Sequence, residues 1–429
     1  MREVKNERLS ESYFEIDHPS GLKILVYPKP GYKSAYAVFG TRYGSIDTQF
    51  RLPEDKEFTT VPEGIAHFLE HKLFESEELD AFQRYAETGA SANAYTSFDK
   101  TCYLFSCTGN FKASLEILLD FVMHPYFTAA TVQKEQGIIG QEIRMCRDEP
   151  GWEALFQLLR AMYKNHPVRI DIAGTEESIS HITADLLYKC YHTFYNLSNM
   201  VLCVAGGVTA EDVLEVADRL LPVQKPVKIE RKFHEEPRGV NTPYVEETLA
   251  VASPIFSLGF KESITTPERT LREILLSRIV LEAVCGKTTP FYTELLEAGL
   301  INTSFDYEYF CGYGYAATIF TGESPDAKEV QNRLIARIRD LQETGIGEAD
   351  FERIRKKLYG RAVMAFNDID GIANAMVAAH FCGEGLFDEV ETLGVLTLDE
   401  ANERLRKSID TTSAALAVIL PKGDDVCNS

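Results

Sequence analysis

The chain has 429 residues, 45% of them hydrophobic, and a formal net charge of −21 at pH 7. This length predicts two domains, and the acidic balance argues against nucleic acid as a partner. No apolar run is long enough to predict a membrane span, and the N-terminus lacks an apolar signal region. The nine cysteines show no paired spacing, which is typical of reduced thiols and predicts a cytoplasmic protein.

The first half of the sequence predicts strands and helices in alternation. In chain order we expect strands at Leu22–Val26 and Ala35–Phe39, a helix around Gly64–Phe74, a helix at Leu79–Ala86, a strand at Asn93–Phe105, helices at Lys112–Met123 and Ala130–Met145, a strand at Asn199–Val204 and a helix at Glu211–Leu221.

The same order then recurs in the second half. We expect a strand at Leu249–Phe260, helices at Glu268–Val284 and Thr289–Ala298, a strand at Phe305–Phe320, helices at Asp326–Leu341 and Asp350–Phe366, and a strand at Ala414–Leu420. A charged, proline-punctuated segment separates the halves. The sequence therefore predicts an α+β protein of two similar domains that arose by internal duplication, at 1–222 and 246–429, joined by a linker at 223–245.

The segment His67-Phe-Leu-Glu70-His71 lies within the first predicted helix. On a helix, His67 and His71 are one turn apart on the same face, so that both imidazoles can bind one ion. With Glu70 beside them as a general base, this is the ligand set of a catalytic zinc, in the reverse order of the H-E-x-x-H motif. The alternative is an amphipathic helix whose histidines face solvent or a polar pocket.

A catalytic zinc needs a third protein ligand. Glu135 and Glu142 lie two helical turns apart and share a face with nearby isoleucines, so either carboxylate is a candidate if that face is buried. The alternative is an ordinary pair of solvated glutamates. Gly137 and Gly140 weaken the helix prediction by about 1 kcal/mol each relative to alanine.

These motifs resemble the insulinase/pitrilysin-type zinc peptidases, which include the mitochondrial processing peptidases. The likeness covers nearly the whole chain, including Gly89–Tyr103, His166-Pro-Val and the Gly174-Thr-Glu-Glu-Ser-Ile segment, and is greatest to the zinc-bearing subunit of bacterial two-subunit enzymes. It implies a processing-peptidase-like fold that binds one zinc ion per chain. By the same resemblance, the metal ligands are His67, His71 and Glu142, the base is Glu70, Glu135 supports a ligand, and substrate adds at Asn93 and Ala94.

The resemblance also implies a partner subunit. Leu296 and Asn302 stand where single-chain relatives carry an Arg and a Tyr near the scissile carbonyl, and neither can replace them. We therefore expect a related chain to supply that pair. The alternative is an alignment displaced by a few residues, with Tyr307, Tyr309 or Tyr313 serving instead.

The expected function is zinc-dependent endopeptidase activity on unfolded peptides or leader segments, with the substrate added as a strand at the sheet edge. An interior position for the strand at Asn93 is the structural alternative. A non-catalytic assembly subunit, a hydrolase of another amide or ester, and a regulatory peptide-binding module are the functional alternatives.

Overall fold

The computed structural model describes residues 1–77 and 80–422. These residues form two compact units, each built from several segments of the chain. Unit 1 contains Met1–Ile143, Asp171–Lys232 and Ala362–Asp388, and unit 2 contains Arg144–Ile170, Phe233–Arg361 and the chain from Glu389 onward. In the described part of the chain, no helix combines the length and hydrophobicity that a membrane span requires.

Unit 1 is built on a seven-stranded sheet, in which β3 and β9 are parallel and the other neighbours are antiparallel. In spatial order the strands are β1 (Arg2–Asn6), β2 (Glu11–Asp17), β3 (Lys23–Pro28), β9 (Met200–Gly206), β4 (Ala35–Thr41), β8 (Thr101–Cys107) and β7 (Ser91–Thr96). A small second sheet holds β10 (Glu230–Arg231), β5 (Gln49–Arg51) and β6 (Thr59–Thr60). The strand β7 lies at one edge of the large sheet.

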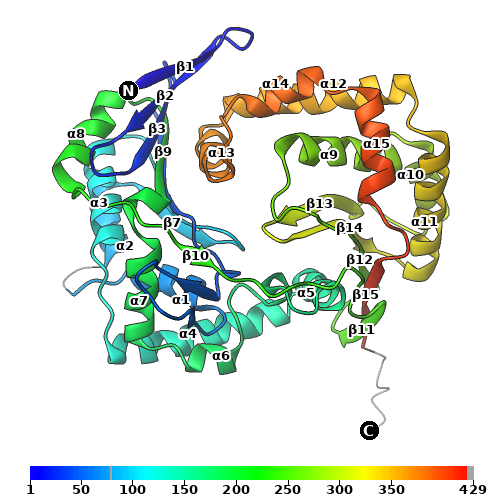
Figure 1. The fold of residues 1–429 in the computed structure, drawn as a ribbon, viewed down its shortest axis with the longest axis horizontal. Helices are drawn as coiled ribbons and strands as arrows, with labels where there is room; N and C mark the ends of the chain where they lie inside the picture. Colours follow the sequence, from blue (N-terminus) through cyan, green and yellow to red (C-terminus); the bar gives the residue numbers. More distant parts are fainter. Residues whose placement is uncertain (78–79, 423–429) are drawn as a thin grey trace. The chain divides into compact units, whose positions relative to one another are not determined.

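Helices cover both faces of this sheet (Figure 1). Side chains alternate along β4, so Ala37 and Phe39 join the main hydrophobic core, while Gly40 faces the other way. A Cβ atom at Gly40 would lie 3.1 Å from Val377 Cγ1, so this glycine lets α13 pack closely on the second face. The helices of unit 1 are α1 (Ile65–Leu73), α2 (Ala81–Thr88), α3 (Phe111–Met123), α4 (Ala129–Arg147), α6 (Glu176–Ser180), α7 (Ala184–Phe194), α8 (Ala210–Leu220) and α13 (Ile369–Cys382).

Unit 2 repeats this plan with five strands, again with one parallel pair, β11 with β15. The order is β11 (Tyr244–Leu249), β15 (Ala414–Pro421), β12 (Ile255–Lys261), β14 (Tyr315–Glu323) and β13 (Asp306–Gly312). A Cβ atom at Gly259 would lie 2.4 Å from Met162 Sδ of α5, so a strand glycine again admits a helix. The helices are α5 (Pro150–Met162), α9 (Leu271–Cys285), α10 (Pro290–Glu297), α11 (Ala327–Thr344), α12 (Glu348–Met364), α14 (Asp388–Val395) and α15 (Leu398–Ser408).

The shared strand order confirms the predicted α+β fold of two similar sheets covered by helices. The compact units are nevertheless not the two halves of the sequence, 1–222 and 246–429. The helix α5 belongs to the first half but packs on the sheet of unit 2, and α13 belongs to the second half but packs on the sheet of unit 1. Periodicity shows that a helix has an apolar face, but it does not show which sheet that face covers.

The expected linker at 223–245 is fixed to both units by ion pairs. Arg231 lies in β10 and donates to buried Asp47 at 2.6 Å within unit 1. In unit 2, Lys261 Nζ is buried and bonds to Glu236 Oε1 at 2.7 Å and to three backbone carbonyls. This segment is therefore an ordered part of each unit rather than a free tether.

Several predicted elements differ in detail from the structure. The single strands expected at Asn93–Phe105 and Phe305–Phe320 are the hairpins β7–β8 and β13–β14, and Leu249–Phe260 is divided between β11 and β12. The elements that were not predicted are the strands β1, β2, β5, β6 and β10 and the helices α5, α6, α7, α13, α14 and α15. Leu79, the expected start of the second helix, lies outside the described residues, and α2 begins at Ala81.

Candidate metal centre

The start of α1 is fixed by two glycines whose backbones touch. Gly64 has φ of +85°, and a Cβ atom there would lie 2.3 Å from Ala173 O. Gly174 has φ of +75°, and its Cβ would lie 2.5 Å from Glu63 O. Ser178 Oγ also donates to Glu63 O at 2.9 Å. The Gly174-Thr-Glu-Glu-Ser segment therefore anchors the helix that carries the histidines.

The helix α1 has only nine residues and is almost entirely buried. A helix this short is marginal in water, so tertiary packing must hold it, and Phe68 and Leu69 are fully buried in the core of unit 1. This packing directs His67 and Glu70 into a largely enclosed site, with exposed fractions of 9% and 7%. His71 is more open, with 27% of its side chain accessible.

The helix α4 brings both predicted glutamates to α1. Gly137 and Gly140 do not interrupt it, because Ile139 and Ile143 are buried in the core and hold it in place. Glu135 is buried, whereas 39% of the Glu142 side chain is accessible. The face of α4 that carries both glutamates is therefore partly buried, as predicted.

Three of these side chains converge with the geometry of a metal site. Glu142 Oε1 lies 3.5 Å from His67 Nε2, and Glu142 Oε2 lies 3.5 Å from His71 Nε2. Ligand atoms of the three residues lie within 4.8 Å of one another, the one such group of three or more among the described residues. Ligand bonds of 2.0–2.2 Å at tetrahedral angles separate donor atoms by about 3.4 Å. The donor set therefore fits a zinc ion with little rearrangement.

A second carboxylate supports one of the histidines. His71 Nδ1 lies 3.0 Å from Glu135 Oε1, so Glu135 can orient the ring with Nε2 toward the ion. His67 Nδ1 is buried and has no hydrogen-bond partner in the described chain. Glu135 thus acts on His71 alone, and α1 packing must fix the ring of His67.

The site is strongly acidic. Burial opposes the charged form of His71, but the hydrogen bond to Glu135 and the carboxylates of Glu70 and Glu142 raise its pKa above the usual value. The contact with His67 outweighs burial and holds the pKa of Glu142 below its usual value. Three carboxylates around two imidazoles favour a bound cation.

Glu70 is hydrogen-bonded to the edge strand. Thr96 Oγ1, at the end of β7, donates to Glu70 Oε2 at 2.6 Å. Asn93 is exposed on the same strand, and its side chain accepts a hydrogen bond from Ala94 N at 2.9 Å. Because β7 is hydrogen-bonded only to β8 in the described sheet, the interior position for this strand is wrong. Thr96 lies within the Gly89–Tyr103 segment that carries part of the family resemblance, but no sequence spacing indicated its contact with Glu70.

The corresponding place in unit 2 holds an ion pair. Glu282 lies three residues before the end of α9, as Glu70 does in α1, but Ile279 and Ala283 stand where α1 has its histidines. Lys357 Nζ of α12 donates to both carboxylate oxygens of Glu282 at 2.7 Å. A lysine ammonium therefore balances this glutamate, where the acidic cluster of unit 1 favours a bound cation.

Leu296 and Asn302 both lie in unit 2. Leu296 is 39% exposed on α10, and the Asn302 side chain bonds to Glu323 and Ser304. Among the alternative tyrosines, Tyr309 OH is held by Glu262 at 2.7 Å and Arg404 at 2.6 Å, so its hydroxyl is already engaged.

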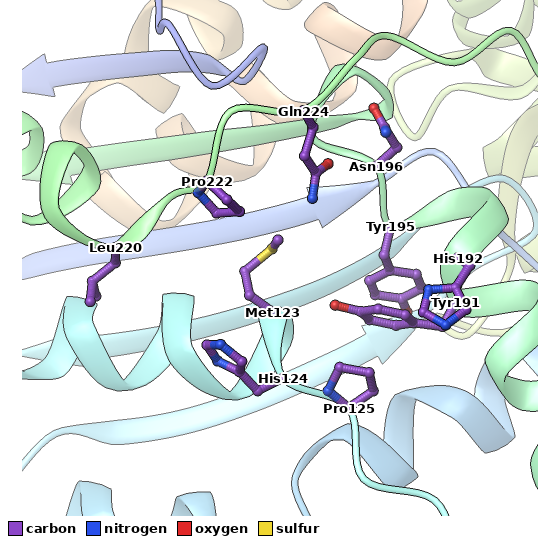
Figure 2. Close-up of a pocket in the computed structure, with 10 residues that line it drawn as sticks. All are labelled: Met123, His124, Pro125, Tyr191, His192, Tyr195, Asn196, Leu220, Pro222 and Gln224. Carbon is purple, nitrogen blue, oxygen red and sulfur yellow. The ribbon is translucent and has the colours of Figure 1, made fainter.

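A cavity of about 300 Å³ lies elsewhere in unit 1, between the ends of α3 and α7 and the segment 220–224 (Figure 2). Tyr191, Tyr195 and Met123 line it, and none of the predicted metal-site residues does. The Tyr195 hydroxyl is engaged with Tyr103 OH at 2.8 Å. The cavity is therefore distinct from the metal centre.

Comparison with known proteins identifies the family of this chain. The profile "Insulinase (Peptidase family M16)" matches residues 59–176, and "Peptidase M16 inactive domain" matches residues 181–358. The chain is 39% identical over 427 residues to an uncharacterized zinc protease, YmfH, of Bacillus subtilis, covering 98% of this chain and 100% of the relative. A second such protein of that organism, YmxG, is 24% identical over 382 residues, covering 84% of this chain and 89% of its own length.

Solved structures give the same result. An M16-like protein of Alicyclobacillus acidocaldarius has a TM-score of 0.92 and 36% identity, over 98% of this chain and 100% of the other. A protease from Helicobacter pylori, with a TM-score of 0.82 and 18% identity over 96% of this chain and 100% of its own, shares the fold. Both likenesses of fold extend over nearly the whole chain. The chain belongs to the insulinase family of peptidases, family M16.

Proposed function

We propose that this protein is a zinc-dependent endopeptidase that hydrolyses unfolded peptides or leader segments. The observation that carries this proposal is the convergence of His67, His71 and Glu142 around one point, with Glu70 alongside. The naming of curated relatives as zinc proteases supports zinc as the ion.

The residues of the site have distinct parts in the proposed reaction. Zinc held by His67, His71 and Glu142 would supply a Lewis acid and lower the pKa of a water molecule toward about 7. Glu70 is the general base that takes a proton from the attacking water and then gives it to the leaving amine. Glu135 keeps the His71 ring oriented through Nδ1.

The edge strand β7 is the proposed substrate site. An extended peptide can add to it as a further strand, with backbone hydrogen bonds that demand little of the substrate sequence. The Ala94 N–H donates to Asn93 Oδ1 within its own strand, an acceptor that a substrate carbonyl can replace. The strand also ends at Thr96, so this edge leads directly to the base.

We further propose that a related subunit completes the site with an Arg–Tyr pair. Support comes from Leu296, which has no donor, and from Asn302, whose amide already bonds to Glu323 at 2.9 Å. The five buried cysteines of the described chain are free thiols, which supports a reducing compartment such as the cytoplasm.

Two measurements test the proposal. Purified wild-type protein should contain one zinc ion per chain, and Glu70→Gln should keep this zinc while losing peptide hydrolysis by a factor of about 100 or more. Zinc-loaded protein that cleaves no peptide, alone or with co-purifying partners, would instead favour an assembly subunit or peptide-binding module. Full activity of the isolated chain would remove the partner subunit from the proposal.

A further inference from the structure

The contact between Thr96 and Glu70 links the edge strand to the proposed base. Glu70 is 7% exposed, and a buried carboxylate requires a donor. Thr96 Oγ1 provides a hydrogen bond at 2.6 Å, the usual length for a hydroxyl that donates to a charged acceptor. Among the described residues, Thr96 is the one hydrogen-bond donor to the Glu70 side chain.

The direction of this hydrogen bond is fixed by chemistry. An ionised carboxylate only accepts, so the hydroxyl hydrogen of Thr96 must point to Glu70 Oε2. Thr101 lies directly opposite on β8, 3.3 Å away between the two hydroxyl oxygens, and is fully buried. Its hydroxyl donates to Tyr43 O at 2.9 Å. The neighbour of Thr96 is therefore anchored in the core.

We propose that Thr96 is a positioning residue that holds Glu70 Oε2, so that Oε1 remains to accept the proton of the attacking water. This inference rests on the proposed peptidase function. Threonine suits the task because its branched Cβ restricts χ1, which limits where the hydroxyl can point. Without this donor the carboxylate can rotate, and it is too buried for solvent to replace the lost partner.

The position of Thr96 predicts which kinetic constant it controls. Substrate affinity would come from the backbone of β7 around Asn93 and Ala94, which a change at the Thr96 hydroxyl leaves in place. The orientation of the base matters only when the proton moves. Loss of the hydroxyl should therefore lower kcat and leave KM nearly unchanged.

The test compares Thr96→Val, which keeps the branched shape, with Thr96→Ser, which keeps the hydroxyl. We expect Thr96→Val to lower kcat by about 10- to 100-fold with KM changed less than about 3-fold, as for loss of a hydrogen bond to a charged group. Thr96→Ser should stay within about 3-fold of wild type. Thr193→Val is the matched control, because Thr193 is also buried but its hydroxyl bonds to Lys189 O within α7.

A second readout does not require peptide cleavage. Wild type and variants loaded with cobalt(II) in place of zinc are compared by visible absorption, which reports the surroundings of the ion. We expect Thr96→Val to shift the cobalt bands in the same direction as Glu70→Gln, and Thr96→Ser to overlay wild type.

The outcomes separate the two claims. The positioning role would be overturned if the cobalt bands of Thr96→Val were identical to those of wild type. It would also be overturned if Thr96→Ser and Thr96→Val lowered kcat equally. If wild type cleaves no peptide, either alone or with co-purifying partners, while the cobalt bands still respond to Thr96→Val, the proposed function is rejected and the positioning of Glu70 stays supported.

Discussion

Glu135 offers the most direct test of how this site holds an ion. Its Oε1 lies 3.0 Å from His71 Nδ1, and the residue is only 6% exposed. A hydrogen bond to a carboxylate in such surroundings contributes about 1.5–3 kcal/mol. Because about 1.4 kcal/mol corresponds to a tenfold change in Kd, Glu135→Ala should weaken zinc binding by about 10- to 100-fold.

The comparison of two substitutions separates charge from orientation. Glu135→Gln keeps an oxygen that can accept from Nδ1 but removes the negative charge, so its loss of affinity should be smaller than that of Glu135→Ala. Zinc affinity is measured by competition with a chromogenic chelator, and thermal unfolding of the apo forms checks the fold. Glu87→Gln, at an exposed position on α2, is the control.

The result that would refute this reasoning is specific. If Glu135→Ala binds zinc within about 3-fold of wild type, the contact with Glu135 does not orient His71 for metal binding. If Gln and Ala variants lose the same affinity, the charge of Glu135 matters and its hydrogen-bond geometry does not.

Three further predictions concern the scaffold. Burial lowers the pKa of His166 to about 4 in the folded protein, below the value near 6.5 of an unfolded histidine. The neutral His166 side chain therefore contributes fully to stability above pH 6.5, and this contribution is lost as the pH falls toward 4. Between pH 7 and pH 5, wild type should therefore lose about 2 kcal/mol more unfolding free energy than His166→Gln in urea titrations, and equal losses would contradict a buried neutral imidazole. Lys261→Met leaves Glu236 without its cation and should lower the unfolding free energy by about 3–5 kcal/mol in the same titrations. The double variant with Glu236→Gln should recover part of this loss. If the loss in the double variant equals the sum of the two single losses, the two residues are not coupled. Gly174→Ala forces a Cβ to within 2.5 Å of Glu63 O, so it should lower the unfolding free energy by about 2–4 kcal/mol and weaken zinc binding. The control is Gly137→Ala, whose Cβ meets no atom within 4 Å in α4 and which should raise the unfolding free energy slightly in the same urea titrations.

The local motif made the candidate metal centre predictable. The positions of His67 and His71 on one helix follow from helical periodicity, and the same rule places Glu135 and Glu142 on one face of α4. These relations lie within single elements, so the residue order is enough to define them. The recurrence of strands and helices likewise indicated the duplicated fold.

Contacts between distant segments required the tertiary structure. Thr96 reaches Glu70 because a strand edge passes beside α1, and Gly174 fixes the start of α1 because two backbones touch. The exchange of α5 and α13 between the units has the same cause, since an apolar helix face fits more than one sheet. The sequence by itself determined which side chains can bind an ion, and only the folded chain decided which neighbours orient them.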